Sequence, residues 1–242
     1  MPDLHNNSEA RESILRSIRS HLATSVPHDE RETASHHVSD RTDSLGQVPA
    51  MPPGNGSLAR MFKESLEAVD GHCVVVQNEA EIASELTAII SGIQQTRLRG
   101  RRIAISDVPM IERLMYLTDL DVDELTVTPN AIDLFGFDVG ITTAQAAIAE
   151  TGTLVLDAAR ERHRLISLVP PVHIAIVDAA NIYQTLGETL SVLHKSRDDV
   201  SATITFITGP SRTADIELTL AIGVHGPQEL HVIINEGPAL RG

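Results

Sequence analysis

The chain has 242 residues, enough for one α/β domain of about 200 residues plus an appendage, or for two small domains. Its 19 Lys and Arg residues against 33 Asp and Glu residues give a formal net charge of −14, and aromatic residues make up 2% of the chain, with no Trp. Such an acidic chain is repelled by phosphate polymers and has almost no rings on which bases could stack, so we expect no nucleic-acid binding.

Cysteine usage and hydropathy exclude further classes. The one cysteine, Cys73, excludes an internal disulfide and an iron–sulfur cluster held by four thiolates of this chain. No paired-Cys, His-x-x-x-His or Asp-rich loop pattern suggests a metal site. No apolar run has the length of a signal-peptide core or of a membrane span. We therefore expect a cytoplasmic protein with no cofactor of its own, no metal and no membrane span.

The first 57 residues differ in composition from the rest. Residues 8–22 carry Ile and Leu at helical spacing, whereas residues 23–57 are rich in Ser, Thr, His, Asp, Pro and Gly and cannot bury enough apolar area to offset their chain entropy. The composition predicts an N-terminal amphipathic helix in residues 1–22, a flexible linker in residues 23–57, and a folded domain in residues 58–242.

Within this domain, short apolar runs alternate with segments of helical periodicity. The pattern predicts strands at residues 72–77, 102–106, 125–128, 139–141, 152–157, 173–177, 204–207 and 230–234, and helices at residues 58–69, 81–93, 109–117, 144–149 and 179–193. The strand segments are apolar throughout, which is typical of strands covered on both faces. The sequence therefore predicts an α/β fold with an open, mostly parallel sheet and helices on both faces.

The segment from Ile207 to Glu217 is a candidate anion site. It leaves a strand through Gly209 and Pro210 and enters a predicted helix, whose free N–H groups and positive dipole end favour an anion. The hydroxyls of Ser211 and Thr213 and the guanidinium of Arg212 would add donors. The alternative is that Ser211 or Thr213 only caps the helix.

A second candidate lies in the segment Ala147–Leu156, at the predicted turn between a helix and a strand. Glu150 could act there as acid, base or nucleophile, shielded in part by the apolar flanks. We predict that Thr151, Gly152 and Thr153 take part in ligand binding, since loop ends of open α/β sheets are common ligand sites. The alternative is an exposed acidic residue in an ordinary turn.

Basic residues and two histidines complete the candidate set. Arg164 closes a basic cluster, residues 160–164, that could attract an anion or could be a solvated loop. His173 opens a strand, and His225 lies between two glycines, where backbone can approach a ligand closely. Either histidine could bind the ligand or serve only as a structural hydrogen-bonding group.

Several motifs together resemble one family. They are Phe137–Thr142, Ala149–Leu154, Leu168–His173, Gly209–Glu217 and Gly223–Pro227, and they occur in the family's order over roughly residues 58–235. In this respect the chain resembles the LUD domain family and, within it, the lactate-utilisation C group. The resemblance implies a fold similar to that of the group containing sugar-phosphate isomerases (NagB, RpiA), coenzyme A transferases and formyltetrahydrofolate cyclo-ligase.

The resemblance also implies a function. It places the chain in a system that oxidises L-lactate to pyruvate, as a cluster-free component beside iron–sulfur partner proteins, with the single Cys73 fitting that role. The alternative is a free-standing enzyme on a phosphorylated or acyl-thioester metabolite, with Arg212 binding the anion and Glu150 performing the chemistry. The flanking residues of Glu150 match the nucleophilic glutamate of coenzyme A transferases only loosely.

Overall fold

The structure is a computed structural model that describes residues 16, 55–158, 164–193, 203–211 and 226–240. The chain divides into two units, residues 1–51 and residues 52–242, and the second contains every element named below. The predicted N-terminal helix, apart from Arg16, lies outside the described residues, as does most of the predicted linker. No helix in the described part of the chain is both long enough and apolar enough to span a membrane.

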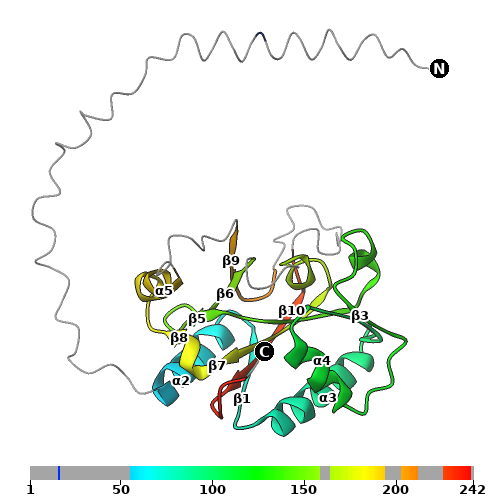
Figure 1. Ribbon diagram of the computed structural model, residues 1–242, viewed down its shortest axis with the longest axis horizontal. Coiled ribbons are helices and arrows are strands. Elements are labelled where there is room, and N and C mark those ends of the chain that lie inside the picture. Colours follow the sequence, from blue (N-terminus) through cyan, green and yellow to red (C-terminus); the bar gives the residue numbers. More distant parts are fainter. Residues whose placement is uncertain (1–15, 17–54, 159–163, 194–202, 212–225, 241–242) are drawn as a thin grey trace, which may run out of the picture. The chain divides into compact units, whose positions relative to one another are not determined.

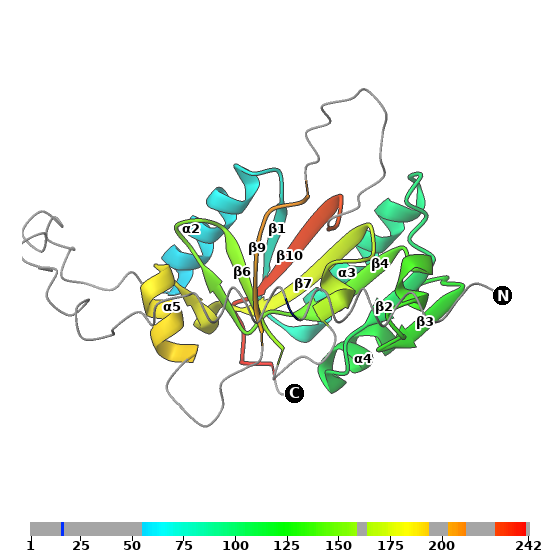
Figure 2. The same cartoon turned by 90° about the horizontal axis from the view of Figure 1, so that it is seen from above.

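The main sheet has six strands, all parallel. Their bounds are β1 His72–Val76, β2 Arg102–Ile105, β3 Glu124–Val127, β4 Val139–Thr143, β7 Val172–Asp178 and β10 Glu229–Asn235. They lie in the order β1-β10-β7-β4-β2-β3 (Figures 1 and 2). Because every pairing is parallel, all six strands begin at one edge of the sheet, the amino edge, and end at the other, the carboxyl edge. The predicted open, mostly parallel α/β sheet is confirmed.

A second sheet was not predicted. It has four strands in the order β8-β5-β6-β9, with bounds β5 Ala146–Ile148, β6 Thr153–Asp157, β8 Ile182–Tyr183 and β9 Ile204–Thr208. Strand β6 pairs antiparallel with β5 and with β9, whereas β8 pairs parallel with β5.

Two predicted helices are wrong in this region. Residues 146–148 form β5, although alanine favours helices, because all three are buried and pair with β6; tertiary burial outweighs the local preference. The predicted helix at residues 179–193 begins instead as the 3-10 turn η4 (Ala179–Asn181) and the short strand β8. Only its second half is helical, as α5 (Leu186–Leu193).

The remaining helices follow their sequence signals. Helix α2 (Asn55–Glu67) begins three residues before its predicted start, α3 spans Glu79–Gln94, and α4 spans Pro109–Tyr116 with proline in its first turn. Asn78 caps α3: its side chain accepts a hydrogen bond from the Glu81 N–H at 3.0 Å, while the Glu81 carboxylate accepts from the Gln77 N–H at 2.7 Å.

The two faces of the main sheet are covered differently (Figure 1). Helices α3 and α4 cover one face, where Leu86 and Leu114 are fully buried against branched side chains of the strands. The opposite face packs against α2, through Phe62 and Leu66, and against the second sheet. Burying one such side chain contributes about 1.5–3 kcal/mol. The covering of this second face is therefore one helix and a sheet, where the sequence predicted helices alone.

Candidate functional site

The turn that joins β5 to β6, residues 149–152, lies at the amino edge of the main sheet. Gly152 adopts a positive φ of 62°, and a Cβ atom there would collide with the backbone of Leu66, near the end of α2. The Ser65 hydroxyl donates a hydrogen bond to the Glu150 carbonyl at 3.5 Å, and the Glu150 N–H donates to the Gln184 carbonyl at 3.2 Å. Glycine is thus required for close packing, and both sides of the turn are anchored.

Three threonine hydroxyls connect this turn to the end of β9. The Thr153 Oγ1 atom lies 2.7 Å from that of Thr151 and 2.7 Å from that of Thr208, so it is hydrogen-bonded to both. Thr153 is buried, whereas Thr151 and Thr208 are exposed. We call Thr151, Thr153 and Thr208 the threonine row. It brings the first sequence-predicted segment, residues 147–156, beside the described part of the second, residues 207–211.

The backbone after β9 turns sharply at the same edge. Gly209 has a φ of 78°, and a Cβ atom there would press on the Val69 carbonyl. Two residues later, the Ser211 N–H donates a hydrogen bond to the Pro227 carbonyl at 2.7 Å. This N–H is therefore used internally, and the anion site predicted here would rely on the groups that follow Ser211.

His173 is fully buried near the start of β7. Its Nε2 atom lies 2.8 Å from the Thr142 hydroxyl, while its Nδ1 atom has no hydrogen-bond partner in the described part of the chain. Burial, with a smaller contribution from His231, lowers the pKa of His173 to about 3, so the ring is neutral at physiological pH. This arrangement corresponds to the structural alternative, since the ring is closed off from solvent.

Of the remaining predicted site residues, the structure describes the side chain of Glu150 and the backbone of Arg164. Glu150 is exposed, and its turn joins two strands, so the partial shielding by apolar flanks that the sequence suggested is wrong. Arg212, Thr213 and His225 lie outside the described residues. Arg164 begins the 3-10 turn η3 (Arg164–Ser167), and its side chain is not described.

Positive charges near the first residues of β2 are paired with carboxylates. Arg101 bonds Asp121 at 2.9 Å and Asp123 at 3.1 Å, which raises the pKa of Arg101 chiefly through the Asp121 hydrogen bond. Arg102 lies 2.8 Å from Glu124, and its hydrogen bond lowers the pKa of that carboxyl. These guanidinium groups are therefore engaged, and an anion at the amino edge would depend on other cations.

A pocket of 350 Å³ opens at the opposite, carboxyl edge. It lies where β2 and β4 end: β2 leads outward to β3 through α4, whereas β4 leads the other way to β7 through the second sheet. Ligands of open α/β sheets usually bind where neighbouring strands diverge in this way. Its polar side chains come from the ends of β4 and β7 and from the segment after β7: Thr143, Gln145, Asp178, Asn181 and Tyr183.

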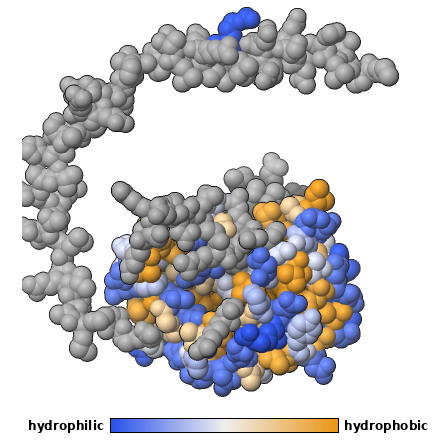
Figure 3. All heavy atoms as spheres, in the orientation of Figure 1, coloured by the Kyte–Doolittle hydropathy of each residue, from blue (hydrophilic) through white to orange (hydrophobic). Residues whose placement is uncertain are grey.

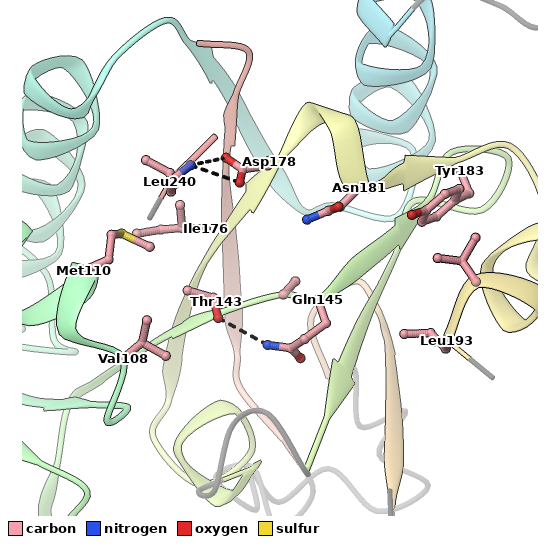
Figure 4. Close-up of a pocket in the computed structure, with 12 residues that line it drawn as sticks. Val108, Met110, Thr143, Gln145, Ile176, Asp178, Asn181, Tyr183, Leu193 and Leu240 are labelled. Atoms are coloured by element: carbon pink, nitrogen blue, oxygen red, sulfur yellow. Dashed lines mark hydrogen bonds between the residues drawn. The ribbon is translucent and has the colours of Figure 1, made fainter. Parts of the chain in front are cut away.

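Two of these polar groups are held in place (Figure 4). Gln145 accepts a hydrogen bond from the Asp157 N–H at 2.7 Å and donates to the Thr143 hydroxyl at 3.2 Å. Asp178 accepts from the Asn235 amide at 2.7 Å and from the Leu240 N–H at 3.2 Å. Within residues 55–158, 164–193, 203–211 and 226–240, no three His, Cys, Asp or Glu side chains are grouped to hold a metal ion.

Comparison with known proteins places these features in a family. The model of the LUD domain matches residues 59–235, which include both sheets and both edges described above. The chain belongs to the LUD domain family.

Named relatives match parts of the chain to different extents. An uncharacterized protein of Neisseria meningitidis serogroup B is 27% identical over 224 residues, covering 93% of this chain and 92% of that one. Lactate utilization protein C of Geobacillus kaustophilus is 38% identical over 100 residues, covering 40% of this chain and 42% of the relative. The same-named protein of Bacillus licheniformis is 34% identical over 102 residues, covering 41% and 42%.

One solved structure is similar in fold. A DUF162 family protein from Deinococcus radiodurans matches with a TM-score of 0.57 and 24% identity, covering 76% of this chain and 99% of that one.

The predicted site residues of this LUD domain that the structure describes lie at the amino edge, and none of them lines the pocket at the carboxyl edge. Thr143 and Asp178 each follow a correctly predicted strand core, so the rule that ligands lie beyond the carboxyl ends of strands could have selected them. Asn181 and Tyr183 carried no such signal, because their segment was predicted to be helical.

Proposed function

We propose that this LUD domain protein acts in lactate utilisation, as the cluster-free subunit that supports oxidation of L-lactate to pyruvate together with iron–sulfur partner proteins. The observation that carries the proposal is the 34–38% identity to proteins named lactate utilization protein C. These matches cover about two fifths of each chain, and the family model covers residues 59–235.

The protonation state of Cys73 supports the proposal that the iron–sulfur clusters are bound by partner proteins. Cys73 lies in β1, and burial raises the pKa of its thiol to about 12. Iron–sulfur clusters are ligated by thiolates, usually four. A single thiol that stays protonated at neutral pH fits a subunit that contributes no ligand.

The amino edge supports a site for a small anionic metabolite in this subunit. The threonine row and Gly209 fix the backbone from which the segment Ser211–Arg212–Thr213 continues. Arg212 supplies the charge in this proposal, and a guanidinium can form two hydrogen bonds with one carboxylate.

Exposed apolar side chains near β3 support a protein partner. Ile132 is 85% exposed and lines a 700 Å³ hollow beside this edge strand, and Phe135, three residues further along the chain, is 83% exposed. Hydrophobic residues (orange) lie among hydrophilic ones (blue) on the same side of the molecule (Figure 3). Asp133 also lines this hollow, whereas Glu124 there is paired with Arg102, so the iron–sulfur partner would present an apolar contact with a cationic group facing Asp133.

The experiment is growth on L-lactate as the sole carbon source in a strain that lacks this gene, complemented with variants. We expect the wild type and Arg97→Ala, an exposed arginine of the α3–β2 loop, to restore growth and lactate consumption, and Arg212→Ala to fail. Co-purification from lactate-grown cells should recover iron–sulfur proteins with the wild type and less of them with Phe135→Ser. Normal lactate consumption by the deletion strain, without another lactate dehydrogenase, would refute the proposal.

The exposure of Glu150 favours one alternative, a free-standing enzyme on a phosphorylated or acyl-thioester metabolite. Its carboxylate is accessible, while hydrogen bonds on both sides fix its backbone. Glu150→Gln should then abolish turnover and leave ligand binding intact, with the exposed Glu64→Gln of α2 as the matched control. Unchanged turnover in Glu150→Gln would remove this residue from the mechanism.

A further inference from the structure

The pocket at the carboxyl edge is chemically unlike the anion site proposed at the amino edge. Its volume of 350 Å³ lies within the range of small-molecule sites. It therefore suggests a second ligand of a different class, on grounds that do not depend on the role in lactate utilisation.

The two walls of the pocket differ in polarity (Figure 4). Val108, Met110, Ile176 and Leu240 form an apolar wall from the start of α4, β7 and the segment after β10. Across the pocket, the Asn181 amide and the Tyr183 hydroxyl point inward, and neither side chain forms a hydrogen bond with another described residue. An apolar surface facing uncharged donors and acceptors suits a flat ring with polar groups along one side.

The described lining of the pocket carries negative charge, which favours an uncharged ligand over an anion. Among the described lining residues there is no Lys, Arg or His, and the one charged group is the carboxylate of Asp178. Asp178 already accepts hydrogen bonds from Asn235 and Leu240. A carboxylate has about four acceptor positions, so this one can still accept N–H or O–H groups of a ligand.

We propose that this pocket binds an uncharged heterocycle of about nucleoside size. Its ring lies on Met110 and Leu240, its ring amide group meets Asn181 and Tyr183, and its hydroxyl groups face Asp178.

The test uses the full chain labelled with 13C-methyl methionine and uridine as the probe. Met110 lines the pocket, whereas Met115 is a buried residue further along α4 and Met61 lies on α2. Uridine should shift the Met110 methyl signal saturably and leave the Met61 and Met115 signals in place. Uridine 5′-monophosphate should bind at least fivefold more weakly, because its phosphate is repelled by Asp178, and L-lactate should leave the Met110 signal unchanged.

Three variants test the location. Val192→Trp should fill the pocket from α5 and abolish the uridine shift, whereas Ser191→Trp, one residue earlier on the same helix, should retain it. Tyr183→Phe should weaken uridine binding about three- to tenfold, the effect of one hydrogen bond, without changing the thermal midpoint.

Four results would overturn the proposal. The first three are no saturable Met110 shift with uridine, equal affinity for uridine and its monophosphate, and a shift that persists in Val192→Trp. The fourth is an equal loss of the shift in Val192→Trp and Ser191→Trp, which would mean that the loss does not come from filling the pocket.

Discussion

The amino and carboxyl edges of the main sheet differ in how their polar groups are used. At the amino edge, the hydroxyls of the threonine row bond one another, the Ser211 N–H bonds the Pro227 carbonyl, and the His173 ring is buried. At the carboxyl edge, polar side chains such as Asn181 and Tyr183 face a 350 Å³ pocket. The described residues of the family motifs therefore bond or pack against one another at the amino edge. The pocket at the carboxyl edge is lined by Asn181, Tyr183 and other residues outside these motifs.

A residue of a family motif need not contact a ligand. Gly152 and Gly209 occur in family motifs because backbones approach closely there, as their positive φ values and contacts with α2 and Val69 show. Ligand groups at that edge must come from side chains that this packed backbone supports.

The largest effect concerns Cys73 at the start of β1. Since burial raises the pKa of its thiol to about 12 from 9.0, the thiolate fraction at pH 8 falls by about three orders of magnitude relative to an ordinary cysteine. Alkylation by iodoacetamide should therefore be slower by about one to three orders of magnitude in the native protein than in 6 M guanidinium, as measured by mass spectrometry. Rapid native labelling would show that this part of the amino edge is open to solvent.

Glycine substitutions compare the packing of the two edges directly. Gly152→Ala forces a positive φ on alanine and a collision with Leu66, so the free energy of unfolding should fall by about 2–4 kcal/mol. Gly237→Ala at the carboxyl edge collides with the Gln77 carbonyl without a positive φ, and should cost about 1–3 kcal/mol.

The matched control is Gly92→Ala in α3, where a Cβ atom meets nothing within 4 Å and the substitution should stabilise by up to about 1 kcal/mol. Urea unfolding followed by circular dichroism measures all three variants. A smaller loss for Gly152→Ala than for Gly237→Ala would reverse the comparison.

The dependence of the free energy of unfolding on acidic pH tests the burial of His173. Its folded pKa of about 3 lies below its unfolded pKa near 6.5, so only the unfolded chain gains a proton between these values. The contribution of the neutral ring to the free energy of unfolding is therefore fully present above pH 6.5. It is lost as the pH falls towards 3, by about 2.7 kcal/mol over two pH units.

His173→Gln should reduce this slope in urea unfolding between pH 6.5 and pH 4.5, while the carboxylates contribute equally to both proteins. His231, whose pKa is also lowered by burial, remains in the variant and keeps part of the slope. An identical pH dependence in both proteins would mean that His173 is accessible to protons in the native state.

The sequence predicted the main sheet well because its strands are apolar runs that only a doubly covered parallel sheet can bury. All seven residues of β7 except Asp178 are buried, as such a run requires. It could not predict β5, because the segment Ala146–Ile148 is short and its alanines favour a helix. The segment is a strand because it pairs with β6 and with β8, which is distant in sequence. The pocket was missed for a related reason: it joins residues of β4, β7, β8 and α5 that are distant in sequence.

The smallest expected effect is the difference in unfolding free energy between removing a hydroxyl from the threonine row and removing one from the wall of the pocket. Thr153→Val keeps the shape of a buried residue but removes the shared partner of Thr151 and Thr208, so the free energy of unfolding should fall by about 1–2 kcal/mol. Thr143→Val removes a pocket-lining hydroxyl that accepts from Gln145 at 3.2 Å, and should cost less, since water in the open pocket can replace it. Equal losses in urea unfolding would mean that the threonine row is as well hydrated as the pocket. The anion proposed at the amino edge would then bind to a flexible segment, without the rigid frame that its recognition by Arg212 requires.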